Sequence, residues 1–251
     1  MIDSYEKIGS GRNPLHRYYR HLILIVILVY PAIGVPEVMS ESKADEFLDA
    51  KNLTPDEFKA AARNVRKTFY WEKKDLATYV TLTKHLLATA ARRAGSEDEH
   101  SAAFGERVIG LGYDLASMTW PGWDEEGIVV TDELRQVGLA AARLIVSVAD
   151  RKAAPAEGRH NNYWILGAHL LASGDSAGAK AAWQTSMDLH ADHDGLGMLA
   201  WMSLADAVAG GSTDALDEYL VKLDAKGGPL AGTANQIRTA RGVFLAPKKS
   251  N

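Results

Sequence analysis

The stretch that decides the fold is Tyr163-Trp164-Ile165-Leu166-Gly167-Ala168-His169-Leu170, which is followed by Gly174-Asp175 and then by Ala179 and Trp183. Gly167 has no side chain, so a second helix can approach the first helix closely there, with the small Ala179 facing it. Gly174 suits the left-handed turn in which many helices end. The stretch therefore predicts two paired helices joined by a tight turn, with Trp183 filling the space beside them.

The same pattern recurs along the chain. A second copy begins at Leu199, 36 residues after Tyr163, with Ser203 in the place of the glycine and Leu199 in the place of the aromatic residue. Its matched positions are Leu199, Met202, Ser203, Asp206, Gly210, Gly211, Ala215, Tyr219, Lys222 and Leu223. A third, interrupted copy is suggested upstream by Val108, Leu111, Gly112 and Leu115 and then by Ala140, Leu144, Ser147 and Val148. Internal repeats of this length indicate an array of helical pairs.

The first copy resembles a tetratricopeptide repeat, a family that pairs antiparallel helices in units of 34 residues. Tyr163, Leu166, Gly167 and Leu170 hold the positions of the aromatic residue, the Leu-Gly pair and the following large residue. The resemblance is clearest over residues 160–228, and most specific up to residue 190. It implies an all-α fold of antiparallel helical pairs in a right-handed array, with a concave groove that binds proteins or peptides. The alternative is another kind of helical array with a chance Leu-Gly pair.

Helix signals also dominate the rest of the chain. Thr54, Pro55 and Glu57 predict a helix start, with Thr54 as the capping residue and Glu57 closing a capping box. We expect helices over about 55–70, 74–94, 104–118 and 131–150, a linker over 151–159, four shorter helices up to about residue 226, and a last helix over 232–244. The only short β-branched run, at 128–130, is expected in a loop. These segments suggest a division into residues 1–40, 41–150 and 160–245.

The N-terminus has the form of a targeting segment. Lys7, Arg12, Arg17 and Arg20 precede an apolar run over residues 22–35. A basic flank before 7–15 apolar residues is typical of a cleaved signal peptide. An uncleaved membrane anchor and a buried core helix are the alternatives, although the run is short for a bilayer span. Both the signal and the anchor place the rest of the chain outside the cytoplasm, either periplasmic or secreted, or tethered to the membrane.

Composition excludes several classes of function. The net charge of -4 does not favour nucleic acid as a partner, since nucleic-acid-binding proteins carry a basic patch or stripe. The absence of cysteine excludes disulfides and thiolate metal sites. His190 and His193 could hold a metal, but no third ligand stands at a recognised spacing, so no metal and no cofactor is expected. We expect a protein that is not an enzyme, because neither a phosphate-binding loop nor a nucleophile elbow occurs.

The resemblance implies a partner-binding groove on the first helix of each pair. Its expected lining in the first pair is Asn161, Trp164, Ala168 and Leu171, and in the second pair Gly197, Ala200 and Leu204. This surface is mostly apolar, so it would accept a hydrophobic segment of a protein or peptide. The alternative is that earlier helices cover the groove, because tryptophan and leucine are more often core residues than ligand contacts.

The connection Trp120-Pro121-Gly122-Trp123-Asp124-Glu125-Glu126 is the most unusual segment of the chain. Two tryptophans in a loop must either pack or bind something. Trp120 and Trp123 are therefore candidate contacts for a partner, or for a small ligand or glycan. The alternative is a structural loop that its own aromatic rings fix to the helices.

The targeting segment leads to a direct test. We expect the full chain, expressed in a bacterium, to leave the cytoplasm. Fractionation followed by mass and N-terminal analysis distinguishes the two forms: a soluble product beginning near Val35 or Glu41 indicates cleavage, and full-length protein in the membrane fraction indicates an anchor. Full-length soluble protein in the cytoplasm would contradict export.

Overall fold

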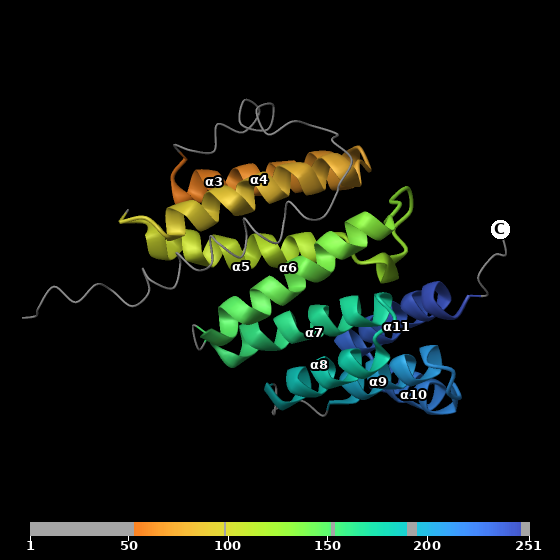
Figure 1. Cartoon of the computed structure of the whole chain (residues 1–251). Helices are drawn as coiled ribbons and strands as arrows, with labels where there is room; N and C mark the ends of the chain where they lie inside the picture. Colours follow the sequence, from red (N-terminus) through yellow and green to blue (C-terminus); the bar gives the residue numbers. More distant parts are fainter. Residues whose placement is uncertain (1–52, 98, 152–153, 190–194, 247–251) are drawn as a thin grey trace, which may run out of the picture.

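The chain forms an all-α array. The computed structural model describes residues 53–97, 99–151, 154–189 and 195–246. These residues contain nine α-helices, one π-helical segment (η1), one 3-10 turn (η2) and no strand, and most neighbouring helices in the chain pack antiparallel (Figure 1). The elements are α3 (Pro55–Val65), η1 (Arg66–Glu72), α4 (Leu76–Ala94), α5 (Ser101–Met118), η2 (Pro121–Trp123), α6 (Asp132–Arg151), α7 (Ala156–Ala172), α8 (Ser176–Leu189), α9 (Leu196–Val208), α10 (Asp214–Lys226) and α11 (Gly228–Leu245).

The first described helix begins as predicted. The Thr54 hydroxyl accepts a hydrogen bond from the Glu57 backbone N–H, and the Glu57 carboxylate accepts one from the Thr54 backbone N–H at 2.9 Å. This reciprocal capping box satisfies two backbone donors that a helix start would otherwise leave unpaired. The helical segment ends at Glu72, two residues after the predicted end near Tyr70. Its last part is not α-helical, however, because α3 ends at Val65 and the π-helix η1 follows it directly.

Helices α7 and α8 form the pair that the decisive stretch predicts. Gly174 adopts a left-handed conformation, with φ of 86°, and terminates α7. The indole of Trp183 lies against Gly167 so closely that a Cβ added there would be 2.5 Å from its Nε1. That nitrogen donates a hydrogen bond to the Trp164 carbonyl at 3.0 Å, which joins the two helices at the same point. The close approach at Gly167 is thus confirmed, and Trp183 is fully buried there.

The other predicted copies have equivalent features. A Cβ added to Gly112 of α5 would be 2.4 Å from the Ile145 side chain of α6, so α5 and α6 also approach at a glycine. Gly210, at the end of α9, has φ of 96°. Two predicted boundaries were wrong. The linker before α7 is shorter than expected, because Gly158 already lies inside α7, and α11 begins at Gly228 because Pro229 suits the first turn of a helix.

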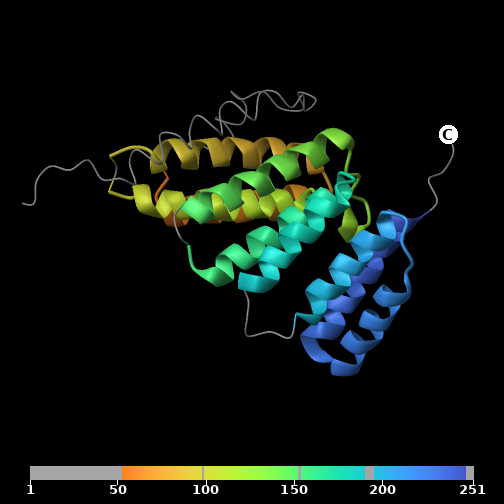
Figure 2. The same ribbon diagram turned by 60° about the horizontal axis from the view of Figure 1, so that its bottom comes forward.

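The helices follow one another across the molecule in chain order, from α3 at one end to α10 at the other (Figure 1). Figure 2 shows α9, α10 and α11 as a group beside the helices α4–α7. One apolar core runs through all of them, from Phe58 to Ala240. The last helix, α11, returns to contact η2, the turn between α5 and α6. Within the described ranges, no helix combines the length and apolar character needed to cross a bilayer.

The close approach at Gly167 can be tested by one methyl group. We expect Gly167→Ala to lower the free energy of unfolding by about 1–3 kcal/mol, because the new Cβ overlaps the buried Trp183 ring. Urea unfolding followed by circular dichroism measures this change. The matched control is Gly242→Ala in α11, where a Cβ meets nothing within 4 Å, so stability should rise by up to about 1 kcal/mol. Equal unfolding midpoints for Gly167→Ala and the wild type would contradict the packing.

Candidate functional site

The two loop tryptophans belong to an aromatic cluster inside the molecule. Trp120 is 1% exposed. Its ring centroid lies 4.8 Å from that of Trp123, 5.9 Å from Trp164 and 5.7 Å from Trp201, all in edge-to-face geometry. Phe244 of α11 is 6.2 Å away. Rings from four separate parts of the chain therefore meet around Trp120.

Hydrogen bonds fix the loop in this position. Trp120 Nε1 donates to the Ala168 carbonyl at 2.9 Å, and Trp123 Nε1 donates to the Ser117 carbonyl at 2.7 Å. Gly122 lies so close to the Trp120 ring that a Cβ there would be 2.3 Å from it. Buried indoles satisfied in this way act as structural anchors. This placement favours the alternative in which the loop is fixed by its own aromatic rings.

The predicted groove residues are mostly inside the array. Ala168, Leu171 and Leu204 are buried, and Gly197 of α9 has a partly exposed environment beside Thr233 of α11. Trp164 is half-buried within the aromatic cluster, and Ala200 is buried as well. Side chains with no accessible surface cannot touch a partner in this conformation. Trp164 and Gly197 keep some accessible surface, and Asn161 is exposed and lines a cleft.

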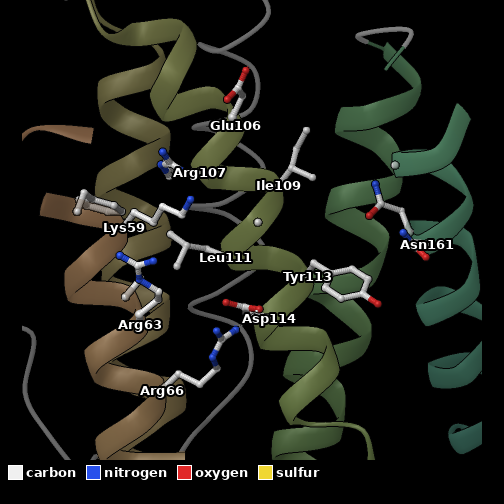
Figure 3. Close-up of a pocket in the computed structure, with 15 residues that line it drawn as sticks. Lys59, Arg63, Arg66, Glu106, Arg107, Ile109, Leu111, Tyr113, Asp114 and Asn161 are labelled. Atoms are coloured by element: carbon white, nitrogen blue, oxygen red, sulfur yellow. Dashed lines mark hydrogen bonds and ion pairs between the residues drawn. The ribbon is translucent and has the colours of Figure 1, made fainter. Parts of the chain in front are cut away.

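That cleft lies between α3, α5 and α7 and has a volume of about 500 Å³. Figure 3 shows basic side chains of α3 and η1 on one side, α5 in the middle and Asn161 of α7 on the opposite side. Apolar groups form much of its floor, among them Ile109 and Leu111 of α5. Gly110 and Gly158 open the cleft further, because a Cβ added to either meets nothing within 4 Å.

Positive charge predominates in the cleft. The cations are Lys59, Arg63, Arg66 and Arg107, and the carboxylates are Glu106 and Asp114. Arg66 donates a hydrogen bond to Asp114 at 2.6 Å, and this ion pair neutralises one charge of each sign. Burial raises the pKa of Asp114 above its usual value, against the opposing effect of Arg66. A strip of unneutralised positive charge therefore remains along α3.

Sequence reasoning missed this cleft. Lys59 and Arg63 are exposed charges on a surface helix, and nothing in the sequence distinguishes them from an ordinary solvated face.

A hydrogen-bonded contact between α7 and α8 was also not predicted from the sequence. Ser186 Oγ lies 2.9 Å from His160 Nδ1 and donates a hydrogen bond to the His160 carbonyl. Ser186 is fully buried, so this contact connects two helices and does not expose a nucleophile.

A buried histidine lies where α6 and α7 cross. His169 is fully buried, and its Nε2 lies 2.8 Å from the Ala116 carbonyl, which can only accept, so Nε2 carries the proton. Its Nδ1 has no hydrogen-bond partner in the described part of the chain. Burial lowers the pKa of His169 to about 4, with Arg135 acting in the same direction and the Ala116 bond opposing it. The imidazole is therefore neutral near pH 7.

Several predictions fall outside the described residues. These are the targeting segment, including residues 22–35, and the pair His190 and His193. Among the residues that the structure describes, no group of three or more histidine, aspartate or glutamate side chains is placed to hold a metal ion.

Comparisons with family profiles, curated proteins and solved structures give no match for this chain.

The neutral His169 predicts acid sensitivity. A base whose pKa is lower in the folded state than the 6.5 of its unfolded form stabilises the fold above pH 6.5 and loses that contribution as pH falls towards 4. We expect this effect to lower the free energy of unfolding of the wild type by roughly 2–3 kcal/mol between pH 7.5 and pH 4.5. In urea unfolding at pH 7.5 and 4.5, His169→Gln should lose less stability than the wild type by about this amount. An NMR titration of wild-type His169 with a midpoint above pH 6 would contradict the assignment, whether or not the variant folds.

Proposed function

We propose that this chain is a non-enzymatic scaffold of tetratricopeptide-like helical pairs that binds a segment of a protein partner in the cleft between α3, α5 and α7. The observation that carries the proposal is the cleft itself, which is open to solvent and lined from three separate helices. Its volume lies within the range of sites that hold a compact ligand or a few residues of a peptide. Asn161 contributes an amide that can bond a peptide backbone.

The chemistry of the lining favours binding over catalysis. The described lining residues include cations, amides and aliphatic groups but no histidine, serine or cysteine. Asp114 is engaged by Arg66, so its carboxylate is not positioned as a free base. Groups of this kind neutralise and orient a ligand without supplying a nucleophile and base pair.

The second candidate is a small-ligand or glycan module that uses Trp120 and Trp123. It lacks a supporting observation, because Trp120 is buried and both indole nitrogens are already bonded within the protein. The proposed location also follows the targeting segment: if that segment exports or anchors the chain, then the partner lies outside the cytoplasm.

The test is to fill the cleft without disturbing the fold. A library of displayed random peptides is selected on the full-length chain, and enriched peptides are titrated against the wild type and Gly110→Leu. Leucine is a better helix former than glycine and has open space at this position, so the variant should fold. We expect it to weaken binding at least tenfold.

Gly242→Leu provides the matched control, since it adds the same side chain to an open site on α11. Its affinity for the peptides should equal that of the wild type. If no peptide is enriched, or if Gly110→Leu binds the enriched peptides as well as the control does, then the cleft is not a peptide-binding site.

A further inference from the structure

We infer that the segment bound in this cleft is extended and acidic, with carboxylates at every second residue alternating with apolar side chains. This inference rests on the proposed function and specifies the partner. It is carried by the arrangement of the cations along α3 and by the lining of the cleft.

The cations form a regular row. Lys59 and Arg63 of α3 and Arg66 at the start of η1 follow one another at intervals of four and three residues, so they lie on one face of this helical segment. With a rise of 1.5 Å per residue, Lys59 and Arg63 stand about 6 Å apart along the axis. In an extended peptide, residues i and i+2 point the same way and lie about 6.6 Å apart. An acidic residue at every second position therefore matches the spacing of Lys59 and Arg63.

These cations are available to a ligand. Within the described part of the chain, neither Lys59 nor Arg63 forms an ion pair. Arg107 has only a 3.9 Å contact with the exposed Asp56, and its buried Nε has no hydrogen-bond partner there. A carboxylate in the cleft would gain charge-assisted hydrogen bonds from such groups. Arg66 is already closely paired with Asp114, at 2.6 Å.

The lining of the cleft suits an extended segment, because successive side chains of such a segment point to opposite sides and can meet both charged and apolar groups. Ile109 and Leu111 of α5 also line the cleft and suit apolar residues of such a segment. Figure 3 shows Leu111 of α5 toward the cations of α3 and Ile109 toward Asn161, so apolar groups lie between the cations and the amide. Alternating acidic and apolar residues present one chemistry to each side.

The surroundings favour carboxylates over the phosphates of a nucleic acid. Glu106 lies at one end of the cleft, and Asp56 stands beside Arg107. A nucleic acid would extend beyond the short row of cations and meet a protein whose net charge is -4. A short acidic segment would contact the row alone.

The experiment uses two fluorescein-labelled peptides, acetyl-Glu-Leu-Glu-Leu-Glu-amide and its counterpart with glutamine in place of each glutamate. Anisotropy titrations with the full-length chain should give a Kd for the glutamate peptide roughly two- to thirtyfold lower at low salt, because two exposed ion pairs contribute about this much. Raising the salt to about 0.5 M should reduce the difference, since the charges are screened.

Arg63→Glu should weaken binding of the glutamate peptide at least tenfold and leave the glutamine peptide nearly unaffected. Arg143→Glu is the matched control, because Arg143 is an exposed cation on α6 outside the cleft and the net charge changes equally. It should alter the Kd less than twofold. If Arg143→Glu weakens binding as much as Arg63→Glu, then the attraction is general and the inference is overturned.

The remaining outcomes separate this inference from the proposed function. Equal affinity for the two peptides, with both blocked by Gly110→Leu, would overturn the acidic specificity and leave the cleft a peptide site. Failure of both peptides while unrelated displayed peptides bind in the cleft would have the same meaning. Tighter binding of a single-stranded oligonucleotide or of anionic vesicles than of the glutamate peptide would assign the cations to phosphate instead.

Discussion

The burial of the Trp120 indole is the interaction on which the rest of the structure depends. A single side chain from the turn after α5 contacts aromatic rings of η2, α7, α9 and α11, and its nitrogen bonds to the Ala168 carbonyl. A large aromatic group buried with a satisfied donor contributes apolar area and orientation together. It thereby sets where α7 lies relative to α5, and the cleft exists because α7 and α3 both pack against α5.

Local features of the fold could be predicted, whereas its long-range contacts could not. The capping box at Thr54, the left-handed Gly174 and the close approach at Gly167 depend on a few neighbouring residues and their backbone preferences. The position of Trp120 depends on rings of Trp164, Trp201 and Phe244, all more than 40 residues away, so its sequence context left both a binding loop and a buried anchor open. The π-helical turn η1 also has no signal that we can identify in the sequence.

The same distinction explains the candidate site. Asn161 was selected because of its position on the first helix of a pair, and the structure places it at a cleft for which α3 and α5 supply the other walls. The cations of α3 were overlooked because exposed lysine and arginine are normal on a surface helix. These cations belong to a candidate site because they lie in the same cleft as Asn161 of α7. The packing of α3 and α7 against α5 brings them together, and no local sequence pattern indicates it.

The contact between η2 and α11 changes how the array should unfold. In a linear array of repeats each unit touches only its neighbours, so the ends can fray while the middle persists. Here Phe244, near the end of the last helix, lies 6.2 Å from the Trp120 ring, which stands between the third and fourth described helices. Loss of α11 would therefore open the aromatic cluster at the centre of the molecule, and early and late helices share one cooperative transition. The helical pairs at this end therefore unfold together with the centre of the molecule, because α11 connects the two.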